Sequence, residues 1–178
     1  MKCNFTYGED WIAIDLKEKR GKSHIGGNIT SSLFTAEIVI VVTESADDLY
    51  FNYACIAMAP MRNFVVMLME VETYAKLKCQ DPAAQFAVLH EVGHYVNGDL
   101  NKTLEERADL YERRRALLYE GIVYEKEIKA DYVALCYMGQ TVAATGLDRL
   151  KEMVMQLSID AELAASEAAR RIAILENA

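Results

Sequence analysis

The chain has few of the residues on which several kinds of site depend. Its 178 residues include four cysteines, three histidines and two prolines. The cysteines are scattered without a Cys-x-x-Cys spacing, and a chain of this size needs no disulfide staples. We therefore expect reduced, mostly structural cysteines and a cytoplasmic protein. The chain also has no phosphate-binding loop, dinucleotide-binding fingerprint or Gly-x-Ser-x-Gly motif, so none of those enzyme classes is indicated.

Positive charge and long apolar runs are scarce as well. The chain carries 19 Lys and Arg against 27 Asp and Glu, which gives a net charge of −8. This balance argues against nucleic acid or an anionic membrane as the main partner. The longest apolar runs, residues 38–42 and 64–69, have the length of a strand, so we expect no membrane span. No apolar run follows the first residues, so we also expect no signal peptide.

The remaining composition is that of a globular protein, with 52% apolar residues. No repeat, low-complexity tract or linker divides the chain, so we expect a single domain over residues 1–178. Patterns rich in Ile and Val predict four strands, of which the last two have the spacing of a hairpin: residues 10–17, 35–43, 50–58 and 64–71. A glycine-rich loop is expected over residues 20–28.

Helices are expected from residue 74 to the end of the chain. A short helix over residues 74–79 leads into a helix that begins after Asp81. Glycines then separate four further predicted helices: residues 103–120, 122–138, 147–157 and 160–175. We therefore expect an α+β fold, with a small, mostly antiparallel N-terminal sheet, one central helix and a helical C-terminal half.

Residues 81–99 form the most informative stretch. Asp81 is a good N-cap and Pro82 a good first helical residue, while Asn97-Gly98 supplies a stop. Between these signals, apolar residues recur at helical spacing: Phe86, Leu89 and Val96, with Val88 and Val92 beside them. The stretch therefore predicts an amphipathic helix with defined ends.

This helix carries the pattern His90-Glu91-Val-Gly-His94. The two histidines are one turn apart on one face, where their imidazoles can hold one metal ion. Glu91 is offset around the helix, where a carboxylate can take a proton from water on the metal and later hand it to a leaving amine. Gly93 is expected to leave room beside the metal face. The pattern is typical of zinc peptidases, and the alternative is a pair of core histidines held by hydrogen bonds.

A catalytic zinc needs a third protein ligand. With no histidine downstream, we expect an acidic residue, with Cys136 and His24 as alternatives. Two segments have the form Glu-x-x-Ala-Asp, residues 105–109 and 127–131, and only the second lies in a helix apolar enough to cross a core. We therefore predict Glu127 as the ligand, and Asp131, one turn further on, as the carboxylate that receives an imidazole N–H. The alternative for Glu127 is a surface ion pair.

These motifs resemble those of the HtpX and CAAX-prenyl-endopeptidase family of zinc metallopeptidases. The likeness rests on His90-Glu-Val-Gly-His-Tyr-Val-Asn-Gly-Asp99, on Lys126-Glu-Ile-Lys-Ala-Asp131 and on the tail Ala169-Arg170-Arg171-Ile172-Ala-Ile-Leu175. It implies a zincin-like fold and a gluzincin site, in which His90, His94 and Glu127 bind Zn²⁺ and Glu91 is the general base. The family's membrane spans and its Thr-His-Pro motif are missing from this chain.

Two alternatives stay open. His-Glu-Val-Gly-His-Tyr and Glu127-Ile-Lys-Ala-Asp-Tyr-Val-Ala are also similar to the ImmA/IrrE peptidases, which cut repressor proteins. In both families the partner is a peptide or protein substrate. The rival from another class is a zinc-binding interaction module without turnover, although a purely structural zinc has no use for Glu91. As oxyanion donors we consider Tyr95, Tyr124 and Tyr132, and we expect an extended substrate to pair with strand 64–71.

Overall fold

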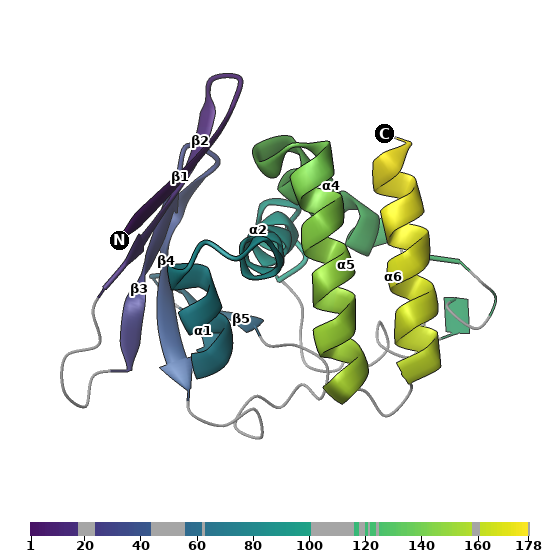
Figure 1. Cartoon of the computed structure of the whole chain (residues 1–178). Helices are drawn as coiled ribbons and strands as arrows, with labels where there is room; N and C mark the ends of the chain where they lie inside the picture. The colour runs from purple at the N-terminus through teal and green to yellow at the C-terminus, as the bar shows by residue number, and fades with distance from the viewer. Residues whose placement is uncertain are drawn as a thin grey trace.

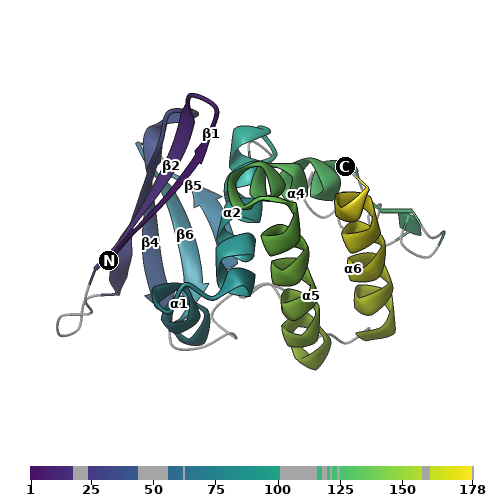
Figure 2. The ribbon, with the colours of Figure 1, turned by 45° about the horizontal axis from the view of Figure 1, so that its top comes forward.

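A computed structural model of the chain describes residues 1–17, 24–43, 56–61, 63–100, 116–117, 120, 122–123, 125–157 and 161–177. The described part is α+β and is arranged in layers (Figures 1 and 2). The N-terminal sheet forms one side, helix α2 lies against it, and helices α4, α5 and α6 lie beyond α2. The predicted fold class, with its mostly antiparallel sheet and helical C-terminal half, is confirmed.

Within the described residues, the sheet contains six strands in the order β1-β2-β3-β4-β6-β5. Every neighbouring pair is antiparallel except β4 and β6, which are parallel. The strands are β1 (Lys2–Tyr7), β2 (Asp10–Leu16), β3 (Ile25–Ser31), β4 (Phe34–Thr43), β5 (Ile56–Pro60) and β6 (Val65–Glu70). The predicted hairpin is confirmed as the β5–β6 pair, although β5 runs on to Pro60 and residues 50–55 of the predicted first strand lie outside the described residues. Strand β1 was not predicted, although its apolar residues alternate at Cys3, Phe5 and Tyr7.

Two expectations for the sheet are wrong. Strand β3 occupies the end of the predicted loop at 20–28, because Gly27 does not mark a turn there. A Cβ atom at Gly27 would lie only 2.2 Å from the carbonyl oxygen of Asp15, so the residue allows close approach of β2. Strand β6 cannot receive a substrate strand, because β4 and β5 already pair with its two edges. In the described sheet, the outer strand on that side is β5.

The described helices are α1 (Val71–Lys78), α2 (Pro82–Val96), α4 (Glu125–Met138), α5 (Gln140–Leu157) and α6 (Ala161–Glu176). The predicted break at Gly146 is wrong, since α5 runs through it. A Cβ atom there would lie 2.6 Å from the carbonyl oxygen of Pro82, so the glycine lets α5 approach the start of α2. The prediction for residues 103–120 lies almost wholly outside the described residues.

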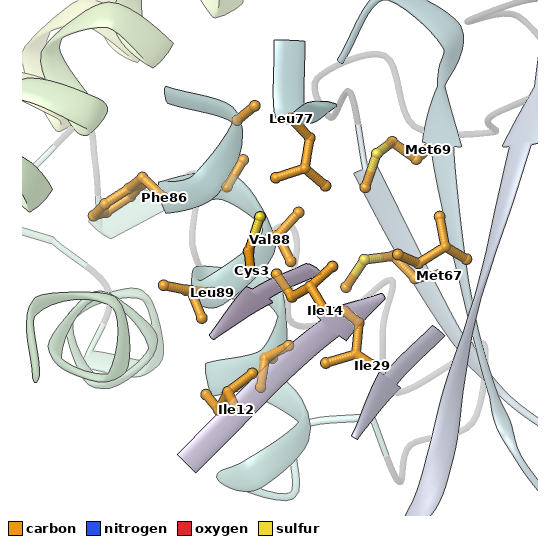
Figure 3. Packing of buried hydrophobic residues seen from close by; sticks show 14 of the residues in the cluster. Cys3, Ile12, Ile14, Ile29, Met67, Met69, Leu77, Phe86, Val88 and Leu89 are labelled. Carbon is orange, nitrogen blue, oxygen red and sulfur yellow. The ribbon is translucent and has the colours of Figure 1, made fainter. Parts of the chain in front are cut away.

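The hydrophobic core lies between the sheet and the helices (Figure 3). Ile12 and Ile14 of β2, Ile29 of β3 and Met67 of β6 are completely buried on the face toward α2. Strand β4, predicted as buried, alternates instead between half-buried and exposed residues up to Glu37 and between buried and half-buried residues from Ile38 onward. The reason is that the described helices pack against one face of the sheet (Figures 1 and 2). Helix α2 is buried on several faces, since the sheet packs on one side of it and α4 and α5 pack on the other.

Three cysteines lie in the described part, and none of them forms a disulfide: Cys3 is buried, Cys136 is half-buried and Cys79 is exposed. Within the same residues, every helix is too short or too polar to cross a lipid bilayer. Both findings agree with what the sequence indicates about these features.

Candidate metal centre

Helix α2 has the ends that the sequence predicts. The carboxylate of Asp81 accepts hydrogen bonds from the backbone N–H groups of Ala83 and Ala84, at 2.9 and 3.2 Å. Asn97 is the C-cap, and Gly98 has the positive φ of 76° that reverses the chain after a helix. Along the apolar stripe Phe86 is fully buried, whereas Val96, at 38% exposed, lies outside the core.

His90 and His94 project from this helix toward Glu127 on α4, so the structure brings the three predicted ligands together. The two histidine Nε2 atoms are 3.0 Å apart. The Glu127 carboxylate lies 3.4 Å from Nε2 of His90 and 3.7 Å from Nε2 of His94. One ligand atom from each of the three residues lies within 4.8 Å of the other two.

This group could hold a metal ion. Ligand atoms about 2.0–2.1 Å from a tetrahedral metal are about 3.3 Å from one another, which is close to the observed spacings. Two imidazole nitrogens and a carboxylate oxygen are a donor set that suits zinc and other first-row transition metals. All three side chains are largely shielded from solvent, with 9%, 15% and 10% of His90, His94 and Glu127 exposed.

The outer nitrogen of His90 is held by the predicted carboxylate. His90 Nδ1 lies 2.7 Å from Oδ1 of Asp131, so in the neutral imidazole an Nδ1–H donates there and Nε2 keeps its lone pair toward the ligand group. Arg171 of α6 donates to both carboxylate oxygens of Asp131, from Nε at 2.7 Å and from Nη2 at 2.6 Å. Glu127 and Asp131 thus share one face of α4, as predicted, with the Glu127 carboxylate beside both Nε2 atoms and the Asp131 carboxylate beside Nδ1 of His90.

The outer nitrogen of His94 has a parallel arrangement. His94 Nδ1 lies 3.1 Å from Oδ2 of Asp99, and the other oxygen of Asp99 accepts from Lys126. Both imidazoles therefore use Nδ1 for a carboxylate, and each of those carboxylates is paired with a cation. Both Nε2 atoms remain for a shared ligand.

The electrostatics of the group favour a cation. Burial disfavours the charged form of His90, but hydrogen bonds to Asp131 and Glu127 outweigh it and raise the pKa of His90 to about 9. Burial alone would raise the pKa of Asp131, and Arg171 and His90 instead hold it below its ordinary value. Carboxylates that stabilise positive charge on an imidazole also stabilise a metal ion bound beside it.

The crossing of α2 and α4 explains how the side chains meet. A Cβ atom on Gly93 would lie 2.8 Å from both the Cα and the carbonyl oxygen of Ala130, so the two helices touch backbone to backbone at this point. His90 and His94 lie three residues before and one after Gly93, and Glu127 and Asp131 have the same offsets from Ala130. The space beside Gly93 is therefore filled by α4, and does not stay open beside the metal face as the sequence suggested.

Gly93→Ala should consequently weaken metal binding by about 10-fold or more, because the added methyl group forces α4 and its two carboxylates away from the histidines. The overpacking should also lower the free energy of unfolding by about 1–3 kcal/mol. Metal affinity can be measured by competition with a chromogenic chelator, and stability by urea unfolding of the metal-free protein.

Gly146→Ala is the matched control for this variant. It adds a methyl group at another tight contact of α2, 2.6 Å from the carbonyl oxygen of Pro82, at the end of the helix away from the histidines. It should cost stability and leave metal affinity unchanged. Equal loss of affinity in both variants would mean that general loosening of the fold is responsible.

The other residues singled out by the sequence lie as follows. Glu91 is half-buried on α2, directly after His90 and outside the trio of ligand atoms. His24 is exposed and Cys136 is half-buried, and neither belongs to a metal-ligating group within the described residues. Glu105 falls outside the described residues.

The tyrosines considered as oxyanion donors differ in their surroundings. Tyr95 packs edge-on against Phe34, with ring centroids 5.1 Å apart. Tyr132 is 38% exposed, and Tyr124 lies outside the described residues.

The sequence interpretation did not assign a role to Asp99, Lys126 or Arg171. For Asp99 a local signal was present, since Gly98 ends the helix and turns the chain back so that the Asp99 N–H bonds the His94 carbonyl at 2.9 Å. Arg171 lies 40 residues from Asp131. In the sequence it stands out only as part of the tail Ala169–Leu175, which resembles the closing segment of the HtpX family.

Comparison of the chain with protein-family models, curated proteins and solved structures finds no match. The fold and the site describe an α+β protein with a candidate His-His-Glu metal centre.

Proposed function

We propose that this protein is a zinc metalloendopeptidase of the gluzincin type, with His90, His94 and Glu127 as ligands and Glu91 as general base. The observation that carries the proposal is the convergence of two Nε2 atoms and one carboxylate within 4.8 Å, next to a glutamate that is not part of the trio. A site with three protein ligands leaves a position for water, which a closed structural site does not.

The donor set is compatible with several first-row metals, and the pattern His90-Glu91-Val-Gly-His94 on one helix favours zinc among them. Zinc in peptidases is bound by two histidines and a glutamate, and both histidines here present Nε2 while Nδ1 donates to a carboxylate. When bound, zinc supplies a Lewis acid that acidifies water and polarises the scissile carbonyl.

Glu91 supplies the proton transfer in this proposal. It follows His90 directly and so projects about 100° further around α2, beside the ligand face. Its carboxylate takes a proton from the attacking water as the new C–O bond forms, and gives it to the departing amine nitrogen as the C–N bond breaks. The reaction is thus the hydrolysis of a peptide bond, with water as the only co-reactant.

The substrate strand has to be placed differently from the sequence expectation. Strand β6 is paired on both edges, so we propose that an extended peptide adds along β5 (Ile56–Pro60), which contacts α2 and is the outer strand on that side of the described sheet. Main-chain pairing of this kind tolerates many side chains, which suits an endopeptidase acting on flexible protein segments.

Metal content and cleavage test this function together. The purified protein should contain about one zinc per chain and should cut unfolded protein substrates such as casein, and a chelator should abolish the cleavage. A protein that has no zinc and takes up none would contradict the site. Zinc binding without cleavage across a broad substrate library would support the interaction module instead.

A further inference from the structure

The C-terminal helix α6 reaches the candidate metal centre, although none of the three ligands lies on it. Arg171 donates hydrogen bonds to both oxygens of the Asp131 carboxylate, at 2.6 and 2.7 Å. Such a two-pronged contact fixes the plane of a carboxylate as well as its position. Only 10% of the Arg171 side chain and 1% of the Asp131 side chain are exposed, so solvent cannot replace either partner.

The same carboxylate oxygen serves two donors. Asp131 Oδ1 accepts from Nη2 of Arg171 and from Nδ1 of His90, at 2.6 and 2.7 Å. Nη2 of Arg171 also lies 3.3 Å from Nδ1 of His90. Because Nδ1 carries the proton that it donates to Asp131, it cannot accept a hydrogen bond from Arg171, and this contact is a close approach of two donors. Rotation of the carboxylate would break the contact with His90, and Arg171 prevents that rotation.

Arg171 also faces further negative charge. Its Nη1 atom is 4.0 Å from Oε2 of Glu127, and the charge of the buried Glu167 acts on it as well. A buried cation needs such partners, and a cation next to a metal site would be unfavourable without them. The carboxylates of Asp131, Glu127 and Glu167 therefore explain why the Arg171 guanidinium can be buried here.

The pair that supports His94 is less enclosed. Lys126, which binds Asp99, is 28% exposed, and Asp99 itself is 13% exposed. A lysine ammonium is also a point donor and cannot fix a carboxylate plane as a guanidinium does. His90 is thus the more rigidly oriented of the two imidazoles, and the residue responsible comes from α6.

We propose that Arg171 is a positioning residue of the metal centre, which acts through Asp131 to aim Nε2 of His90 at the metal. The inference rests on the proposed metal site, but not on the proposed peptidase activity. It makes helix α6 a part of the site, so that changes in this helix alter metal binding.

The test compares Arg171→Met and Arg171→Lys with Arg170→Met in the full chain. Arg170 is the neighbouring arginine on the same helix, and its Nη1 atom has no hydrogen-bond partner among the described residues. Zinc affinity is measured by chelator competition, and coordination geometry by the visible absorption of the Co²⁺-loaded protein. Thermal unfolding of each metal-free variant reports on structural effects.

Arg171→Met should weaken zinc binding by about 10–100-fold and change the Co²⁺ spectrum, as loss of an outer partner of a ligand does. Arg171→Lys should restore part of the affinity, since it keeps the charge but contacts one oxygen at a time. Arg170→Met should match the wild type in affinity and spectrum.

Two results would overturn the inference. One is an Arg171→Met protein that unfolds at lower temperature but keeps wild-type affinity and spectrum, since Arg171 would then only stabilise the fold. The other, should Arg171→Met fail to fold, is an Arg171→Lys protein that is wild-type in both affinity and spectrum. A wild-type protein that binds neither metal would overturn the site and the proposed function as well, whereas metal binding without peptidase activity would affect the function alone.

Discussion

Glu91→Gln is expected to lower the rate of peptide hydrolysis by at least about 100-fold while zinc content stays at the wild-type level. Removal of a general base costs about 10²–10⁴-fold in rate, and an amide of nearly the same shape cannot accept the proton of the attacking water. Glu91 lies outside the group of ligand atoms, so the substitution should leave metal binding intact. The comparison requires cleavage rates and metal content for both proteins, purified in parallel.

Glu125→Gln provides the matched control for this variant. Glu125 is exposed at the start of α4 and pairs with Lys129, 2.6 Å away, so the same chemical change is made on a solvent-exposed side chain that has no proposed role. It should keep wild-type activity. Equal cleavage by wild type and Glu91→Gln would indicate a contaminating protease, and loss of zinc in Glu91→Gln would mean that Glu91 is needed for metal binding.

Glu127→Ala is expected to weaken zinc binding by more than about 100-fold. Changes to partners outside the ligand shell already cost about 10–100-fold, and this substitution removes one of three ligands. Glu127 is buried, and its carboxylate faces both histidines. Without it, the metal would have two protein ligands, both on helix α2. Zinc affinity by chelator competition measures the effect directly.

Two further glutamates sharpen this test. Glu125→Ala removes an exposed carboxylate from the same helical turn of α4 and should leave affinity unchanged. Glu105→Ala tests the other segment with the form Glu-x-x-Ala-Asp, and it should also bind zinc normally. Loss of the metal in Glu105→Ala together with its retention in Glu127→Ala would reject Glu127 as the ligand.

The parts of the site that the sequence predicted are those governed by local geometry. Capping by Asp81, the stop at Gly98 and the one-turn spacing of His90 and His94 all depend on residues close along the chain. A helix with these ends presents both imidazoles on one face whatever packs against it. For the same reason Glu127 and Asp131 were correctly expected to share a face of their helix.

The choice between Glu127 and Glu105 shows where local reasoning ends. Both belong to the same short motif, and only the apolar character of residues 128–138 favoured the first. The structure places Glu127 within 3.4 Å of His90, a contact between residues 37 positions apart. The apolar pattern indicated which helix crosses the core, but it carried no information about the distance between Glu127 and the histidines.

Glycines were the residues most often misinterpreted. Gly146 was expected to end a helix, Gly27 to lie in a loop and Gly93 to leave open space. In the structure each one is where another backbone approaches too closely for a Cβ atom. A glycine that ends a helix or strand and a glycine that allows close approach of another backbone look the same in a sequence. The difference depends on which distant segment packs against the glycine.

By itself, then, the sequence determined the fold class, the ends of α2 and the pairing of two histidines with an adjacent glutamate. Only the tertiary structure decided that Arg171 holds Asp131, that Gly93 meets Ala130 and that β6 is enclosed by its neighbours. The physical reason is the range of the interactions. Helix periodicity and capping act over a few residues, whereas an ion pair or a helix crossing depends on how distant segments pack to bury their apolar faces.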